Sequence, residues 1–231
     1  MIVAFEGMDG VGKSSTAKEV AARTNFIHET QKMVNIMGIK ENEFSRLVKA
    51  VRSSTNEKLG FMFYTFRCML DIESKKDTIV ERTMISTYYF EHEKVSQEEF
   101  DYAMSLNVIP DVTFLLYASS EERYKRIYLR NACDTDLKSK EALTDGYPIM
   151  LEFVKRYNIP YIGIDTEKYT QEEVIDICSD IIRRLKNMDP SQRQGYIELM
   201  NSEFGFDRKY KPVERKLINE IRHNNNRNGT K

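Results

Sequence analysis

The sequence predicts an α/β fold: a parallel sheet flanked by helices, followed by a helical C-terminal extension. Short apolar and β-branched runs alternate with longer segments of helical periodicity, the pattern of parallel strands joined by crossover helices. The first run, residues 2–6, leads into a glycine-rich turn and then into a helical segment. A chain of 231 residues is long enough for one such domain and an appendage.

Apolar runs bounded by polar residues predict strands at residues 2–6, 26–29, 78–81, 112–117 and 161–164. Helical patterns predict helices at residues 13–23, 41–51, 57–74, 97–106, 121–131, 137–157 and 171–186. We place the main domain at 1–186 and the extension at 187–231. Residues 193–203 and 212–222 can form helices there, whereas the polar end, 224–231, lacks apolar side chains to bury and is expected to be disordered.

Composition excludes several classes of protein. The formal net charge is −1, so nothing in the balance of charges suggests a nucleic-acid partner. No apolar run approaches the roughly 20 residues that span a bilayer, so no membrane partner is expected. The three cysteines are far apart and without C-x-x-C spacing, as in reduced cytoplasmic proteins. The three histidines form no spaced set of metal ligands.

The most specific motif is Gly7-Met-Asp-Gly-Val-Gly-Lys-Ser14, which fits the P-loop pattern G-x-x-x-x-G-K-[ST]. Its glycines, Gly7, Gly10 and Gly12, allow a tight turn that brings backbone N–H groups onto phosphate oxygens. Lys13 can reach the outer phosphates, and the Ser14 hydroxyl can ligate Mg²⁺. With Val11 and Ser15, these residues form the predicted donor site, which implies a nucleoside triphosphate and Mg²⁺.

Charged residues that directly follow strands are the next candidates, because ligands of parallel sheets lie beyond the carboxyl ends of the strands. Glu29, the pair Glu81 and Arg82, and the pair Asp165 and Thr166 occupy such positions. A carboxylate such as Glu81 can hold Mg²⁺ or accept a proton, and Arg82 can pair with a phosphate. A solvated loop with a structural ion pair is the alternative for Glu81 and Arg82.

Two helical segments carry further candidates. Phe63 and Arg67 share one helix face, where a ring and a guanidinium could bind a nucleobase, although an aromatic stripe is more often core. Arg123, Arg126 and Arg130 lie at i, i+3 and i+7, and arginines can stabilise the charge of a transferring phosphoryl group. A solvated basic face explains the same spacing equally well.

Taken in order, these segments resemble thymidylate kinases, within the nucleoside monophosphate kinase group of P-loop proteins. Residues 5–14 resemble that family's F-E-G-x-D-G-x-G-K-[ST], and residues 63–67 its F-x-x-x-R segment. Glu81 and Arg82, followed by Ser86, resemble D-R-Y…S, and residues 110–116 resemble P-D-L-T-[LF]-x-L. Residues 123–130 resemble the start of the mobile lid, and 136–147 the long helix after it. The resemblance covers residues 1 to 186.

The resemblance implies a P-loop kinase that transfers a phosphoryl group from ATP, with Mg²⁺, to a pyrimidine deoxynucleoside monophosphate, most simply dTMP. Ser14 and Glu81 would organise the metal, while Asp9 and Arg82 would orient the acceptor. Phe63 and Arg67 would hold its base, Ser86 would belong to the same site, and Arg126 and Arg130 would close over the transferring group. Asp165 and Thr166 would border the adenine. A cytoplasmic homodimer acting in nucleotide biosynthesis is expected.

One segment departs from the family. The family's R-E-P-G after the second strand is His28-Glu-Thr-Gln31 here, and Asp-Arg is replaced by Glu81 and Arg82. Both departures resemble deoxynucleoside kinases, in which the second-strand glutamate takes a proton from a sugar 5′-hydroxyl. A deoxynucleoside kinase with Glu29 as base is therefore the first alternative. The second is a non-catalytic, regulatory nucleotide-binding protein that has lost the acceptor site.

Overall fold

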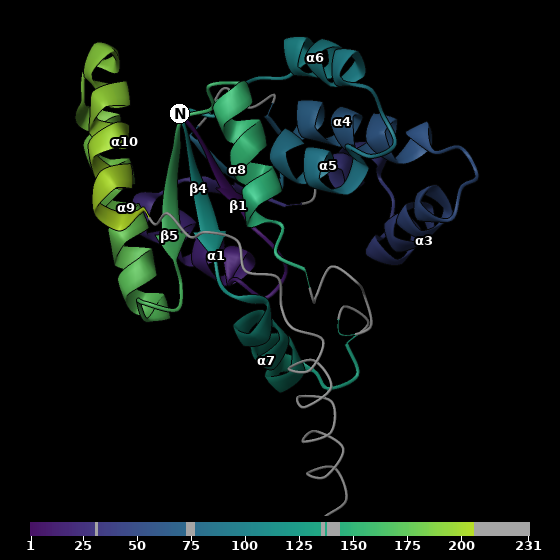
Figure 1. Ribbon diagram of the computed structural model, residues 1–231, viewed down its shortest axis with the longest axis horizontal. Coiled ribbons are helices and arrows are strands. Elements are labelled where there is room, and N and C mark those ends of the chain that lie inside the picture. The colour runs from purple at the N-terminus through teal and green to yellow at the C-terminus, as the bar shows by residue number, and fades with distance from the viewer. Residues whose placement is uncertain (31, 73–76, 135–136, 138–143, 206–231) are drawn as a thin grey trace, which may run out of the picture.

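A computed structural model describes residues 1–30, 32–72, 77–134, 137 and 144–205 (Figure 1). In this part of the chain one parallel sheet has the strand order β2-β3-β1-β4-β5. The strands are β1 Ile2–Glu6, β2 Ile27–Glu29, β3 Thr78–Glu81, β4 Val112–Tyr117 and β5 Tyr161–Asp165. All five strands lie within one residue of the predicted bounds, and the parallel α/β fold is confirmed.

Strand β1 is central and pairs with two strands that are far away in the sequence. Val3 lies opposite Ile79 of β3 on one side and opposite Val112 of β4 on the other. Both faces of β1 are covered, so it is a nearly continuous apolar run rather than an alternating one. Phe5 is fully buried and stacks on Phe114 with ring centroids 5.1 Å apart. Because all pairs are parallel, every strand ends at the same edge of the sheet.

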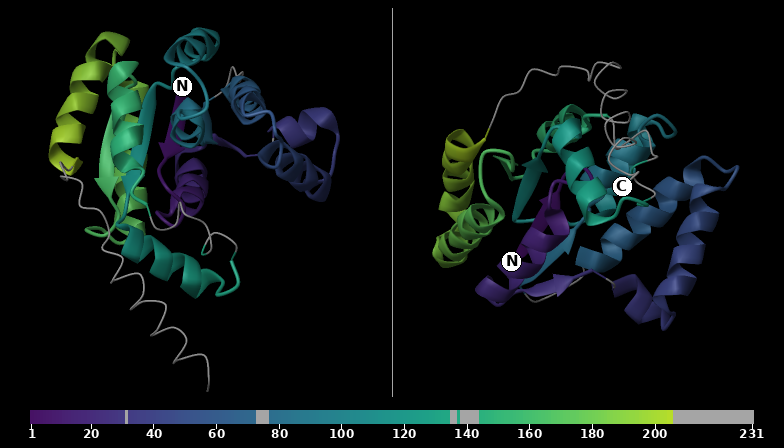
Figure 2. Two further views of the ribbon diagram at one scale, coloured as in Figure 1. Left: turned by 45° about the vertical axis from the view of Figure 1, so that its right-hand side comes forward. Right: turned by 90° about the horizontal axis from the view of Figure 1, so that it is seen from below.

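Helices cover both faces of the sheet (Figure 1). Helix α1, Lys13–Thr24, packs on α9, Gln171–Asn187, and on β3. Helix α5, Met84–Glu91, packs on α8, Tyr147–Arg156, and on α4, Lys58–Ile72. Helix α6 spans Gln97–Leu106, and α7, Ser120–Arg130, lies beyond the carboxyl edge of the sheet. Helices α2, Lys32–Met37, and α3, Glu41–Arg52, pack on α4 on the side opposite α9 (Figure 2).

Two of these helices, α2 and α5, were not predicted from the sequence. Helix α5 has a clear start signal, because the Thr83 hydroxyl accepts a hydrogen bond from the backbone N–H of Ile85. Its residues, MISTYYFE, are buried on most sides, so no polar stripe marks a helical period. Helix α2 has only six residues, too few for a period to stand out.

The predicted helix over 137–157 is confirmed over residues 147–156, whereas residues 144–146 are not helical. Helix α8 begins at Tyr147, with Gly146 as its N-cap and a proline in its first turn. Gly146 is needed there because a Cβ would approach the Met8 sulfur to 2.4 Å and the Tyr89 ring to 2.5 Å. Most of the remaining predicted length, like the predicted helix at 212–222 and the polar end, lies outside the described residues.

The extension contributes helix α10, Pro190–Phe204, which packs on β5. Ile197 and Met200 are buried against the core, and the Asn201 side-chain oxygen accepts a hydrogen bond from the backbone N–H of Gly163 at 2.8 Å. This first part of the extension therefore completes the sheet edge rather than forming a separate module. None of the helices in the described ranges is long and apolar enough to cross a bilayer.

The packing of α10 can be tested with two substitutions on this helix. Ile197→Ala should lower the free energy of unfolding by about 2–4 kcal/mol, because it opens a cavity under a side chain that is 2 % exposed. Leu199→Ala, at a position that is 59 % exposed, should change it by less than about 0.5 kcal/mol. Urea unfolding measures both. Equal, small effects would mean that α10 does not pack on β5.

Candidate active site

The turn between β1 and α1 has the backbone of an anion-binding loop. Gly7, Gly10 and Gly12 have φ angles of 136°, 87° and 94°, in the region that side chains disfavour. A Cβ on Gly7 would also lie 2.3 Å from the carbonyl oxygen of Leu116. No side chain caps α1, so the N–H groups of its first turn remain available for phosphate oxygens.

Lys13 is buried at the start of α1. Its ammonium donates a hydrogen bond to the carbonyl oxygen of Met8 at 2.9 Å and lies 3.7 Å from the Asp9 carboxylate. Burial, together with the neighbouring charge of Arg82, lowers the pKa of Lys13 to about 8, against the opposing influence of Asp9. The lysine therefore has a charge that is poorly solvated, which a phosphate group would stabilise.

A chain of hydrogen bonds joins the start of α1 to the second and third strands. The Ser14 hydroxyl donates to the Glu81 carboxylate at 2.5 Å, and the His28 ring lies 2.9 Å from the other oxygen of that carboxylate. Burial acts to raise the pKa of Glu81, but the hydrogen bonds from His28 and Ser14 outweigh it and hold the pKa below its usual value. Glu81 therefore stays a carboxylate beside a serine hydroxyl.

Arg82, which follows β3, has a strained backbone. Its φ is 61°, a left-handed conformation that is uncommon for residues other than glycine. The Arg67 guanidinium donates to the carbonyl oxygens of Glu81 and Arg82 at 3.1 and 3.2 Å, which holds this turn from one side. The Arg82 side chain forms an ion pair with Asp9 of the P-loop. Burial opposes the charge on Asp9, yet Arg82 and Lys13 keep the pKa of its carboxyl low.

The same turn is held from the other side by Glu6, the last residue of β1. Glu6 is completely buried, and its carboxylate accepts hydrogen bonds from both the backbone N–H and the hydroxyl of Thr83. The backbone N–H and hydroxyl of Ser86 donate to it as well, the hydroxyl at 2.6 Å. Ser86 was predicted as a substrate ligand; here the residue is 4 % exposed and its hydroxyl bonds to Glu6.

The opposite wall of the site comes from α7 and the residues after β5. The Arg126 guanidinium donates to the hydroxyl and the carbonyl oxygen of Thr166 at 2.9 and 2.8 Å, and to Glu122 at 2.9 Å. Arg130, one turn further along α7, pairs with Asp134 at 2.6 Å. Asp165 is fully buried, and its carboxylate accepts the backbone N–H of Glu167 at 3.0 Å, so it shapes the turn.

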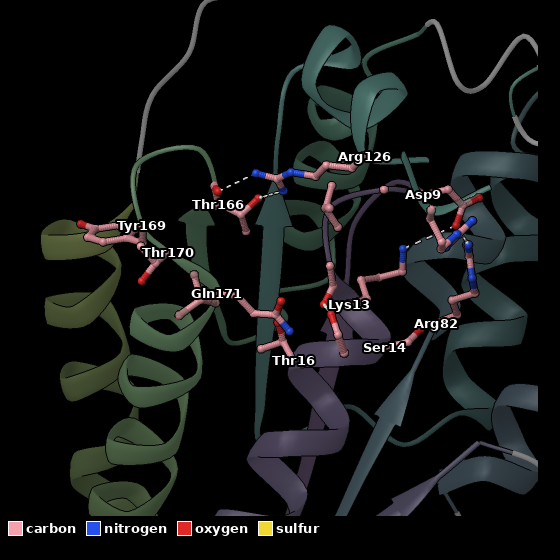
Figure 3. A pocket seen from close by; sticks show the side chains of 16 residues that line it. Asp9, Lys13, Ser14, Thr16, Arg82, Arg126, Thr166, Tyr169, Thr170 and Gln171 are labelled. Atoms are coloured by element: carbon pink, nitrogen blue, oxygen red, sulfur yellow. Dashed lines mark hydrogen bonds and ion pairs between the residues drawn. The ribbon is translucent and has the colours of Figure 1, made fainter. Parts of the chain in front are cut away.

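The two walls enclose a cavity of about 720 Å³, with Asp9, Lys13 and Arg82 on one side and Arg126 with Thr166 on the other (Figure 3). Its lining brings together most of the predicted donor and phosphoryl-transfer residues, namely Asp9, Gly10, Val11, Gly12, Lys13, Ser14, Ser15, Arg82, Arg126, Arg130 and Thr166. The cavity therefore combines a P-loop with an arginine that follows β3 and two arginines of α7, which suits a polyphosphate.

Other predicted residues lie outside this lining. Phe63 and Arg67 are on α4, where the Phe63 ring centroid lies 6.2 Å from that of Phe44 on α3. Glu29 ends β2 at the carboxyl edge of the sheet, opposite Val80. Glu81 lies next to the cavity through its bond to Ser14.

Sequence reasoning missed several residues of the site. Glu6 directly follows an apolar run, the same position at the end of a strand that marks the other candidates. In the sequence Arg123 belongs to a row of basic residues, for which a solvated face was one explanation. In the structure Arg123 is buried, with an exposure of 1 %. At the far end of the cavity, Tyr169, Thr170, Gln171 and Val174 were also missed. Their signal is the capping box of Thr170 and Glu173, which starts α9 directly after the Asp165 turn.

The sequence matches the thymidylate kinase family over residues 5–177. The chain belongs to the thymidylate kinase family. It is therefore a kinase of the nucleoside monophosphate kinase group, an enzyme that uses a nucleoside triphosphate as phosphoryl donor, and the predicted family and enzyme class are confirmed. Membership also favours an enzyme over the regulatory, non-catalytic alternative.

The relatives of this chain have names that state different substrates. A probable thymidylate kinase of Methanocaldococcus jannaschii is 26 % identical, covering 81 % of this chain and 97 % of the relative. A probable thymidylate kinase of Methanococcus aeolicus is 29 % identical, covering 79 % and 94 %. A cytidylate kinase of M. jannaschii is 23 % identical, covering 80 % and 99 %.

Solved structures agree with the fold. Deoxyadenosine kinase from M. mycoides with bound dATP superposes with a TM-score of 0.56 at 17 % identity, covering 80 % of this chain and 100 % of that one. Thymidylate kinase from Ehrlichia chaffeensis gives a TM-score of 0.53 at 17 % identity, covering 80 % and 98 %. At this identity the likeness establishes the shared fold.

Ser86→Ala tests whether this serine serves the fold or the substrate. Loss of its bond to a buried carboxylate should lower the free energy of unfolding by about 2 kcal/mol and leave the acceptor KM nearly unchanged. Ser105→Ala is the control, because Ser105 is exposed and its hydroxyl bonds to the carbonyl oxygen of Tyr102 in its own helix. A large rise in acceptor KM without loss of stability would instead make Ser86 a substrate ligand.

The lowered pKa of Lys13 predicts a pH dependence of nucleotide binding. The ammonium that attracts phosphate is lost as the pH rises through about 8. Affinity for the nucleoside triphosphate should therefore fall above that pH, by up to about tenfold per pH unit. Calorimetric titration from about pH 7 to about pH 10 measures it. Lys13→Ala should bind weakly without this dependence, and a flat profile in the unaltered protein would contradict the prediction.

Proposed function

We propose that this protein transfers the γ-phosphoryl group of ATP, in the presence of Mg²⁺, to a pyrimidine deoxynucleoside monophosphate, and that the acceptor is dTMP. The observation that carries the proposal is the cavity in which P-loop residues face arginines from two other elements. A triphosphate and a monophosphate together bring several negative charges to one place. Cations from separate walls are what such a pair of ligands needs.

The residues at the two ends of the cavity suit the two halves of ATP. The P-loop glycines and Lys13 would hold the phosphates through backbone N–H groups and one ammonium. The other end carries Thr166, Tyr169 and Gln171, a mixture of aromatic and amide groups that suits a base. The predicted placement of the adenine beside Thr166 is consistent with this arrangement.

Ser14 and Glu81 fit a magnesium ion by their chemistry. Both offer oxygen atoms, which this hard cation prefers, and the carboxylate stays charged because its pKa is low. Bound Mg²⁺ would neutralise charge on the β- and γ-phosphates during transfer. The Ser14 hydroxyl donates to Glu81 here, and it would turn its oxygen toward the metal instead.

The remaining residues act by position and charge. Arg82 would bind the acceptor phosphate, with Asp9 fixing the direction of its guanidinium. Arg126 and Arg130 would stabilise charge on the transferring group, for which Arg126 exchanges its bonds to Thr166. Phe63 would stack on the acceptor base. Arg67, already bonded to the β3 turn, would both hold that turn and contact the base.

A deoxynucleoside kinase remains the second candidate, favoured by one observation. Glu29 ends β2 at the same edge of the sheet as Glu81 and Arg82, where a general base for a 5′-hydroxyl would be needed. In that reaction Glu29 would take the hydroxyl proton as the oxygen attacks the γ-phosphorus, and ADP would leave.

Acceptor specificity separates the two candidates. The purified protein should phosphorylate dTMP at a rate at least about tenfold above that with thymidine, dCMP or deoxyadenosine. Glu29→Gln should retain most of the dTMP rate, because a monophosphate acceptor needs no base as strong as a carboxylate. Glu93→Gln, an exposed position, is the matched control. Phosphorylation of thymidine but not dTMP, abolished by Glu29→Gln, would establish the nucleoside kinase instead.

A further inference from the structure

The P-loop tip is packed against a buried arginine of α7. Arg123 is only 1 % exposed, and its guanidinium donates to the carbonyl oxygen of Asp9 at 3.3 Å and to that of Thr144 at 2.5 Å. Thr144 directly precedes the turn that starts α8. One side chain therefore joins the P-loop, α7 and the chain just before α8.

Gly10 shows how close this contact is. A Cβ on Gly10 would lie 2.8 Å from the backbone oxygen of Arg123 and 3.0 Å from its Cβ. Gly10 also has a φ of 87°, so both the conformation and the space at this position demand glycine. Helix α7 can therefore pack this closely on the P-loop tip only because residue 10 is a glycine.

An arginine is a costly residue to bury at such a point. Burial lowers the pKa of its guanidinium, and the neighbouring carboxylates of Asp145 and Asp9 offset only part of that effect. An apolar side chain of similar size would often give equal or greater stability. Stability alone therefore does not explain why a charged guanidinium with several N–H donors is buried at position 123.

The residue that Arg123 contacts in the P-loop, Asp9, provides an explanation. Asp9, whose backbone Arg123 holds, forms the ion pair with Arg82, and Arg82 is the strained residue after β3. Asp9 is thus fixed at its backbone from the α7 side and at its side chain from the β3 side. Any shift of the Asp9 backbone moves the partner of the arginine that is proposed to bind the acceptor.

We propose that Arg123 is a positioning residue that sets Asp9, and through it Arg82, so that the acceptor phosphate is aligned with the P-loop. Arg123 is buried and is not among the described residues that line the cavity. The inference rests on the proposed role of Arg82, and its test includes a readout that does not depend on which acceptor is correct.

Arg123→Met removes the charge and the donors but keeps much of the volume. Lys125→Met is the matched control, because Lys125 lies on the same helix and makes an exposed pair with Glu121. Hydrogen exchange in Arg123→Met should rise in the P-loop and around residues 80–84 but not in β4 or β5, and Lys125→Met should leave all of them unchanged. Unchanged exchange at the P-loop, or a rise across the whole sheet, would overturn the proposal.

Kinetics give the second readout, with the acceptor that turns over fastest. Arg123→Met should lower kcat/KM for that acceptor by about tenfold or more, with ATP affinity in the absence of acceptor changed less than about threefold. Adding Asp9→Ala should cost little beyond either single change, because the two residues act as one unit. Additive losses, or a parallel loss of ATP affinity, would overturn the proposal.

Arg123→Lys keeps the proposal testable if Arg123→Met does not fold. A lysine keeps the charge but cannot bridge both carbonyl oxygens with a fixed fork. Its kcat/KM should fall between those of the unaltered protein and Arg123→Met, with a smaller rise of exchange at the P-loop. Kinetics and exchange equal to those of the unaltered protein would show that the two bonds do not position Asp9.

Discussion

The buried carboxylate of Glu6 is the constraint on which the rest of the site depends. With no access to water, its charge must be balanced by hydrogen-bond donors, and Thr83 and Ser86 supply them from the start of α5. This fixes α5 against the end of β1. In the two-residue link between β3 and α5, Arg82 has a left-handed backbone with a φ of 61°. Such strain costs on the order of 1–3 kcal/mol and persists only where the surroundings hold it.

The strained turn links the two halves of the proposed reaction. Arg82 and Asp9 form an ion pair that joins the end of β3 to the P-loop, and Lys13 lies beside them. On the far wall, Arg126 is held by Thr166 at the end of β5. The parallel sheet brings all of these ends to one edge, so cations from separate parts of the chain meet around one cavity. Poor solvation raises the free energy of the Lys13 charge, and bound phosphate would relieve it.

The helical extension contributes to the sheet rather than to the cavity. Helix α10 covers β5, and Asn201 bonds to Gly163 within that strand. Strand β5 is the edge strand that ends in Asp165, and Thr166 then lines the cavity. Packing on α10 therefore supports the strand from which one wall of the site begins. Tyr169 connects the two regions more directly, since its ring lies 6.2 Å from that of Phe204 on α10.

The sequence by itself determined the strands, the P-loop and the family, because each depends on local properties: apolar runs, glycines at positive φ and a fixed order of short motifs. It also identified the lysine and arginines of the cavity. Only the tertiary structure decided the hydrogen-bond partners of Glu6, Ser86 and Arg123, and the existence of α5. These depend on partners far away in the chain, such as Thr83, which lies 77 residues from Glu6. A buried polar group looks like any other polar residue in a sequence, and only the strand order reveals which donors surround it.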